Sequence, residues 1–157
     1  MSWPPSYDES YRPQPGSRYW FRARECQDPE AREREVLTKI QAVMRWAWER
    51  APFYRKKWQA AGLEPGDIKS LADFRKVPIL TKDELRKDQA EHPPFGSYLC
   101  IEPAEVFHVH GTSGTTGKPT AFAIGRGDWR RIANAHARVM WGFGLRPGDT
   151  VFFGSFF

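Results

Sequence analysis

The sequence predicts an α/β protein in which a mostly helical N-terminal region, residues 19–104, precedes the beginning of an α/β domain, residues 105–157. Three observations lead to this prediction. Apolar residues recur at helical spacing in the first hundred residues, the spacing becomes strand-like near Glu105, and a loop of small hydroxylated residues follows. Because the chain ends in an apolar stretch that needs strands beside it, we expect the fold to be incomplete over these residues.

The composition favours a cytoplasmic protein without a membrane partner. Apolar residues make up 40% of the 157, and no apolar run approaches the ~18 residues that a membrane helix needs. The N-terminus lacks the basic start and apolar segment of a secretory signal. The two cysteines, Cys26 and Cys100, lie in no metal or redox spacing, which favours free thiols over a disulfide.

The formal net charge of +5 is compatible with nucleic acid, an anionic surface or small anionic substrates. Basic residues alternate with acidic ones, as in residues 22–25 and 32–35. A nucleic-acid-binding protein more often gathers its basic residues on one face. The charge pattern therefore argues against a nucleic-acid partner, and a solvated helix surface is the favoured interpretation of these charges.

Residues 1–18 form a proline-rich leader that precedes the first predicted helix. Four prolines in the first 16 residues predict an extended segment whose aromatic residues can still pack on the domain. Asp28-Pro29-Glu30 predicts a helix start, since Asp caps free N–H groups and Pro fits the first helical position. This helix is expected to reach about Ala51. Its predicted core-facing residues are Val36, Leu37, Ile40, Val43, Met44, Ala47 and Trp48.

Three shorter helices are expected next. One covers residues 53–61 and another covers residues 71–76. The third begins at Thr81, which forms a capping box with Glu84, and it ends before His92 because two prolines follow.

Two strands and a helix are predicted in the last third of the chain. Residues 106–110 alternate between faces as a strand does, and residues 120–124 form a second strand antiparallel to the first. Asp128 is expected to cap a helix that reaches about Gly142, and residues 150–153 predict a buried strand. The predicted buried side of the helix consists of Ile132, Ala133, His136, Val139, Met140 and Phe143.

The loop between the two strands, residues 111–118, carries the predicted chemistry. It contains three glycines, three threonines, one serine and one lysine. Glycines let consecutive N–H groups face one anion, the hydroxyl groups add donors, and the lysine adds positive charge. The predicted polyphosphate-binding residues are Gly111, Thr112, Ser113, Gly114, Thr115, Thr116, Gly117 and Lys118.

This loop is not a Walker A motif. That motif requires a glycine five residues before the Gly-Lys pair, where this chain has Thr112, and a serine or threonine after the lysine, where it has Pro119. The predicted context is also strand–loop–strand rather than strand–loop–helix. A P-loop kinase or GTPase is therefore not expected.

Residues 112–119, Thr-Ser-Gly-Thr-Thr-Gly-Lys-Pro, resemble the phosphate loop of the adenylate-forming superfamily, which includes acyl-CoA ligases, peptide-synthetase adenylation domains and luciferases. The usual form continues with Lys-Gly after the proline. The Thr120-Ala121 found here resembles the phenylacetate–CoA ligase branch instead. Residues 45–55 and 74–82 also resemble that branch, so the resemblance extends over residues 19–157.

The resemblance implies the N-terminal part of an AMP-forming ligase that activates a carboxylic acid, here expected to be an aryl acid, and transfers it to coenzyme A. ATP, Mg²⁺ and coenzyme A are the implied cofactors and co-substrates. Thr112, Ser113, Thr115 and Thr116 would bind the β- and γ-phosphates, the three glycines would shape the loop, and Lys118 would screen charge. The family's catalytic and metal-binding residues would lie after Phe157, so we predict that residues 1–157 alone are inactive. A homodimer is plausible for the intact protein.

The sequence leaves two other functions open. One is an adenylating enzyme that passes its acyl group to a carrier protein, and the other is a non-catalytic fragment that binds nucleotide phosphates or a protein partner. His108 and His110 share one face of a strand, and with Cys100 they raise the alternative of a metal site. Because zinc sites usually need four ligands, lining of the substrate pocket or plain packing is the favoured role of these histidines.

Overall fold

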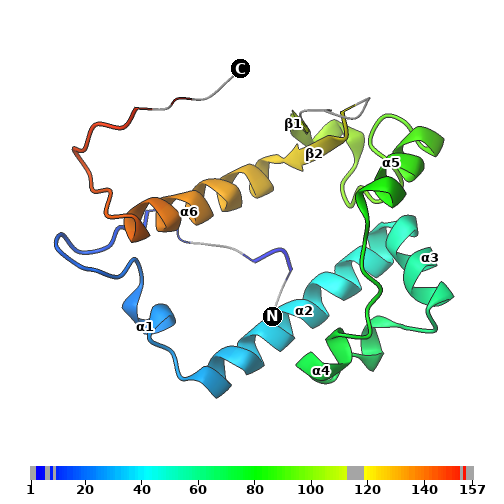
Figure 1. The fold of residues 1–157 in the computed structure, drawn as a ribbon, viewed down its shortest axis with the longest axis horizontal. Coiled ribbons are helices and arrows are strands. Elements are labelled where there is room, and N and C mark those ends of the chain that lie inside the picture. Colours follow the sequence, from blue (N-terminus) through cyan, green and yellow to red (C-terminus); the bar gives the residue numbers. More distant parts are fainter. Residues whose placement is uncertain (1–2, 6–7, 9, 113–118, 153, 155–157) are drawn as a thin grey trace.

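The computed structural model describes residues 3–5, 8, 10–112, 119–152 and 154 (Figure 1). Figure 1 shows two long helices, α2 and α6, with α3, α4 and α5 grouped beside one end of α2. The elements are α1 (Arg22–Glu25), α2 (Pro29–Arg50), α3 (Pro52–Ala60), η1 (Pro65–Asp67), α4 (Leu71–Phe74), α5 (Lys82–Glu91), η2 (Pro103–Glu105), β1 (Val106–Gly111), β2 (Ala121–Gly125) and α6 (Arg126–Gly142), where η marks a 3₁₀ turn.

Helix α2 begins where the sequence predicts. The Asp28 carboxylate accepts a hydrogen bond from the backbone N–H of Ala31 at 3.0 Å, and Pro29 occupies the first helical position. The helix ends at Arg50, because Ala51 turns to an extended conformation and Pro52 begins α3.

The core lies between α2, α3 and the η1 turn. Its buried members are Met44, Ala47, Trp58 and Ile68, and the rings of Trp48 and Trp58 stack with centroids 6.3 Å apart. The buried face of α2 is narrower than predicted: Val36 and Val43 are exposed. Each of these valines lines an open groove, since α3 and η1 cover the side of the helix that carries Met44.

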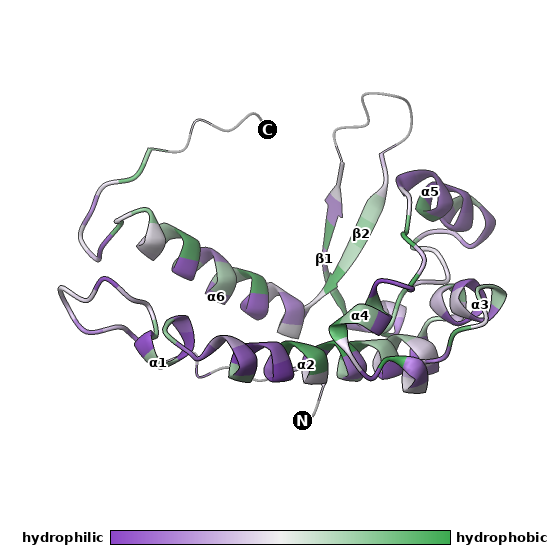
Figure 2. Cartoon of the chain, turned by 60° about the horizontal axis from the view of Figure 1, so that its bottom comes forward, coloured by the Kyte–Doolittle hydropathy of each residue, from purple (hydrophilic) through white to green (hydrophobic). Residues whose placement is uncertain are grey.

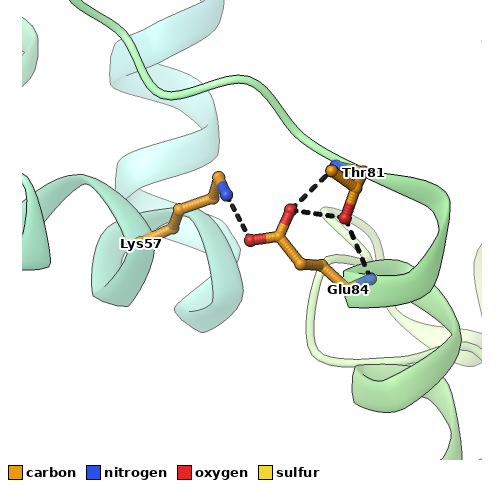
Figure 3. A network of polar contacts seen from close by, with 3 residues as sticks. All are labelled: Lys57, Thr81 and Glu84. Atoms are coloured by element: carbon orange, nitrogen blue, oxygen red, sulfur yellow. Dashed lines mark hydrogen bonds and ion pairs between the residues drawn. The ribbon is translucent and has the colours of Figure 1, made fainter.

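An ion pair joins α3 to α5 (Figure 3). The Thr81 hydroxyl accepts from the backbone N–H of Glu84 at 3.3 Å, and the Glu84 carboxylate accepts from the backbone N–H of Thr81 at 2.8 Å. This confirms the predicted capping box. The other oxygen of the same carboxylate binds the ammonium group of Lys57 on α3, so the first turn of α5 is fixed on the helical core.

Strands β1 and β2 pair antiparallel, as predicted, with an irregularity between Val106 and His108. Helix α6 follows β2 without a turn, so its cap is Gly125 and the prediction of Asp128 as cap is wrong. Asp128 instead lies in the first turn, where its carboxylate accepts a hydrogen bond from the Arg131 side chain at 2.7 Å. The helix starts early because the strand continues directly into it.

The predicted burial of α6 is also wrong for much of its apolar side. Ile132 and Val139 are exposed, and Phe143 is 81% exposed, whereas Trp141 is 5% exposed. Among the described residues, α6 packs mainly on β1, β2 and the N-terminal segment, which leave its other face uncovered.

The strand predicted at residues 150–153 is not formed in its described part, residues 150–152. Phe152 is 92% exposed. A strand needs a neighbour for its backbone hydrogen bonds, and the two-stranded sheet described here pairs β1 only with β2. Among the described residues, no helix is both long and apolar enough to cross a membrane.

The described part of the proline-rich leader docks on α6. The indole N–H of Trp141 donates to the Ser17 carbonyl at 3.1 Å, and the Arg146 guanidinium lies over the Trp141 ring at 3.8 Å. Trp20 meets Trp141 edge-on with centroids 5.9 Å apart. Within the leader, the Tyr11 ring lies 6.1 Å from Trp20 and 5.3 Å from Phe21 between centroids, so this aromatic residue packs on the chain that follows, and Pro13 is buried.

Candidate functional site

The glycine-rich loop is the candidate site, and the structure describes both of its stems. Six of the predicted residues lie outside the described residues: Ser113, Gly114, Thr115, Thr116, Gly117 and Lys118. Of the eight predicted phosphate-binding residues, the structure places Gly111 and Thr112 at the end of β1. On the other side it places Pro119 and Thr120, directly before β2.

Two hydrogen bonds between Thr112 and Thr120 close the neck of this loop. The Thr112 N–H donates to the Thr120 carbonyl at 3.1 Å, and the Thr120 N–H donates to the Thr112 hydroxyl oxygen at 3.1 Å. The next pair of the ladder is Gly111 with Ala121. The two ends of the predicted loop therefore meet at the Thr112–Thr120 pair of an antiparallel hairpin. Figure 2 shows this hairpin beside α5.

The outer side of β2 is held by a side-chain amide from α5. Gln89 donates through Nε2 to the Ala121 carbonyl at 2.9 Å and accepts through Oε1 from the Ala121 N–H at 3.1 Å. The Tyr98 hydroxyl donates to the same carbonyl at 3.1 Å and accepts from Gln89 Nε2 at 3.3 Å. The sequence alone does not reveal this contact, because 32 residues separate Gln89 from Ala121 and no local pattern links them.

A buried carboxylate fixes the turn that carries Tyr98. Asp88 accepts hydrogen bonds from the backbone N–H of Ser97 at 2.7 Å and from its hydroxyl at 2.6 Å. Gly96 has a φ of +82°, and a Cβ added there would lie 2.7 Å from an Asp88 carboxylate oxygen. The turn therefore requires glycine at this position. Burial and the nearby Asp88 charge raise the pKa of Tyr98, so its hydroxyl remains a donor at neutral pH.

Thr120 is the most enclosed residue of the stem. It is 0% exposed, and its hydroxyl has no hydrogen-bond partner among the described residues. An unpaired buried hydroxyl lowers stability, since it loses its hydrogen bonds to water without replacing them. Among the described residues, the hydroxyl at the neck of the loop is therefore a hydrogen-bonding group without a partner.

A groove of about 620 Å³ lies beside the stem. Its walls come from α2, α3, residues 74–80, residues 98–101 and β2. The lining is mainly apolar and includes Trp46, Tyr54, Phe74, Leu80, Cys100 and Phe122. Burial raises the pKa of the Cys100 thiol, so this cysteine is a packing residue of the groove rather than a nucleophile.

The two histidines of β1 pack against each other, and His108 also packs against Trp129 of α6. The ring centroids of His108 and His110 are 6.5 Å apart, and that of His108 lies 4.7 Å from the ring of Trp129. Within the described ranges, no group of three or more His, Cys, Asp or Glu side chains is close enough to hold a metal ion. The described geometry therefore assigns His108 a packing contact.

No family model matches the sequence. The chain is 35% identical over 113 residues to a phenylacetate-coenzyme A ligase of Escherichia coli K12, and 39% identical over 115 residues to one of Aromatoleum evansii. These matches cover 72% and 73% of this chain but 25% of each relative. The chain therefore spans about a quarter of the length of these curated relatives.

Solved structures of a 2-hydroxyisobutyryl-CoA ligase are similar to this chain in both fold and sequence. One, in complex with 2-HIB-AMP and CoA in the thioesterification state, has a TM-score of 0.90 and 57% identity over 95% of this chain and 31% of that protein. Another, in the postadenylation state with 2-HIB-AMP, has a TM-score of 0.87 and 56% identity over 92% of this chain and 30% of that protein.

Proposed function

Since this chain belongs to the phenylacetate–CoA ligase-like branch of the adenylate-forming enzymes, we propose that it is the phosphate-binding portion of an AMP-forming acid–CoA ligase. In the proposed reaction a carboxylate oxygen attacks the α-phosphorus of Mg-ATP and displaces pyrophosphate, which leaves an acyl-adenylate. The thiol of coenzyme A then attacks the acyl carbon and AMP departs. Mg²⁺ enters with ATP as part of the substrate.

One observation carries the proposal: a closed antiparallel stem frames a segment composed of glycine, serine, threonine and lysine. The Thr112–Thr120 backbone bond brings both ends of that segment together. A loop held in this way can turn successive N–H groups and hydroxyls toward one polyphosphate. We assign the β- and γ-phosphates of ATP to Thr112, Ser113, Thr115 and Thr116, the shape of the loop to Gly111, Gly114 and Gly117, and charge screening to Lys118.

Two carboxylic acids are candidates for the substrate. The 55–57% identity to 2-hydroxyisobutyryl-CoA ligase exceeds the 32–39% identity to the phenylacetate-CoA ligases, which favours a small 2-hydroxy acid. The aryl acid expected from the sequence finds support in the groove beside β2, whose lining is rich in aromatic side chains. We favour the 2-hydroxy acid, because the larger identity extends over 92–95% of the chain.

A substrate panel tests this proposal. The complete gene product is incubated with Mg-ATP, coenzyme A and either 2-hydroxyisobutyrate or phenylacetate, and AMP, pyrophosphate and thioester are quantified by mass spectrometry. We expect equal amounts of AMP and thioester with the favoured acid. ADP formation or acid-independent hydrolysis would refute a ligase, whereas acid-dependent pyrophosphate exchange without a CoA thioester would favour the carrier-protein alternative.

The role of the loop has its own test. Lys118→Met is expected to raise the KM for Mg-ATP by about tenfold while changing the KM for the acid less than twofold, since a lost charge-assisted contact to phosphate acts on the nucleotide. Lys82→Met, an exposed lysine at the start of α5, serves as the matched control. Equal KM values for Mg-ATP in both variants would remove Lys118 from the site. Residues 1–157 alone are expected to show no ATP–pyrophosphate exchange.

A further inference from the structure

The contact between Gln89 and Ala121 lies outside the proposed phosphate-binding residues, yet it acts on the strand that leaves the loop. We propose that Gln89 and Tyr98 are positioning residues that hold the outgoing stem of the phosphate loop and thereby set the affinity for the triphosphate of Mg-ATP. This inference rests on the proposed function, because it assumes that the loop binds nucleotide phosphates.

The hydrogen-bond pattern of the hairpin explains why Ala121 needs a partner. In an antiparallel pair, residues that exchange backbone hydrogen bonds alternate with residues whose N–H and C=O groups point away from the partner strand. The backbone N–H of Thr112 bonds the carbonyl of Thr120, so the next residue, Ala121, turns its N–H and C=O to the open side of β2. These two groups would otherwise be an unpaired strand edge.

The side-chain amide of Gln89 replaces the missing strand at this one position. A carboxamide presents a donor and an acceptor at the spacing of a peptide group, and Gln89 uses both on the backbone of a single residue. The Tyr98 hydroxyl adds a second donor to the Ala121 carbonyl. Three hydrogen bonds therefore converge on the first residue of β2, directly after the stem residue Thr120.

Both positioning residues are themselves anchored. The Lys57–Glu84 ion pair fixes the start of α5 on α3, and the Asp88–Ser97 hydrogen bonds fix the turn before Tyr98. The outgoing stem at Ala121 is therefore already ordered when the helical region folds. Its loss of conformational entropy does not have to be paid when the nucleotide binds. A ligand that meets a preorganised stem binds more tightly than one that must order it.

The experiment compares wild type, Gln89→Leu, Tyr98→Phe and the control Gln59→Leu in the complete gene product. Gln59 is exposed on α3, so the control makes the same chemical change away from the stem. Isothermal titration gives the Kd for Mg-ATP, and hydrogen exchange followed by mass spectrometry gives the protection of residues 119–125. Tyr98→Phe removes one hydroxyl and keeps the ring, so it tests the proposal even if Gln89→Leu folds poorly.

We expect Gln89→Leu to weaken Mg-ATP binding by about five- to tenfold, Tyr98→Phe by about two- to fivefold and Gln59→Leu by less than twofold, with faster exchange of residues 119–125 in the first two. Unchanged affinity with faster exchange would reduce the contact to a structural role and overturn the inference. If wild type and all three variants bind Mg-ATP with the same Kd, the inference is overturned and the proposed function stands. Wild type that binds no Mg-ATP would overturn both.

Discussion

Lys57 on α3 and Glu84 on α5 form an ion pair in which the carboxylate also caps its own helix (Figure 3). The Lys57 side chain is largely enclosed, whereas that of Glu84 is partly exposed. One carboxylate thus serves two purposes: it satisfies the first N–H of the capping box and it joins two helices. The hydrogen bond from Lys57, followed by those from Thr81, lowers the pKa of Glu84 to about 2.

The first prediction concerns acid stability. A carboxyl group whose pKa is lower in the folded than in the unfolded chain stabilises the fold above its unfolded pKa of about 4.3. This contribution is lost as the pH falls toward about 2. Glu84→Gln should therefore be less stable than wild type at about pH 6, and the difference should vanish near pH 2. Urea unfolding across this range measures the difference.

Glu91→Gln is the matched control, because Glu91 is exposed at the end of the same helix. Its unfolding midpoint should follow that of wild type at each pH. Asp73, whose pKa is also lowered to about 2 by Lys76 and Ser70, is intact in both variants and contributes equally. A Glu84→Gln variant as acid-sensitive as wild type would contradict the prediction.

The second prediction concerns the N-terminal segment. Trp141→Phe keeps an aromatic ring for Trp20 and Arg146 but removes the indole N–H that donates to Ser17. The loss should cost about 1 kcal/mol of stability and speed tryptic cleavage after Arg18 or Arg22, while Trp141→Ala should cost about 3–5 kcal/mol. Trp129→Phe, at an exposed site on α6, should leave both measurements unchanged. Equal cleavage rates in the two Phe variants would show that the leader does not depend on this contact.

Local signals account for the parts of the fold that the sequence predicted well. The caps at Asp28 and Thr81 depend on residues within one helical turn, so the sequence around each was sufficient. The prediction of Asp128 as a cap is wrong because an acidic residue suits both the cap and the first turn of a helix. The position of Asp128 is decided by the direct continuation of β2 into α6, which the local sequence does not show.

Non-local contacts account for what the sequence could not show. Helical periodicity marks the apolar side of α6, yet it carries no information on whether another element covers that side, and Val139 is exposed. The same holds at the candidate site. The loop could be recognised from its own residues, whereas Gln89 reaches Ala121 only because the fold brings the second half of α5 beside the start of β2.

The third prediction concerns the buried hydroxyl at the neck of the loop. Valine has nearly the shape of threonine, so Thr120→Val replaces a hydroxyl that has no partner among the described residues with a methyl group. The change should raise stability by up to about 1 kcal/mol without nucleotide. Thr38→Val, at an exposed position of α2, should change stability by less than about 0.5 kcal/mol. Urea unfolding measures both. A destabilised Thr120→Val variant would show that the hydroxyl does have a partner.

The fourth prediction separates the two cysteines by their reactivity. Cys26 is exposed, whereas Cys100 is half-buried in the groove and burial raises the pKa of its thiol. Since the thiolate is the nucleophile, iodoacetamide at about pH 8 should modify Cys26 at least about fivefold faster than Cys100 in the folded protein. In urea the two rates should converge. The Cys26→Ser variant isolates the slower labelling of Cys100, and peptide mass spectrometry assigns each site.

Rapid labelling of Cys100 in the folded protein would contradict this prediction, because it would mean that solvent reaches the thiol in the groove. Failure of both cysteines to react before reduction would mean that they form a disulfide, against their free state in this structure.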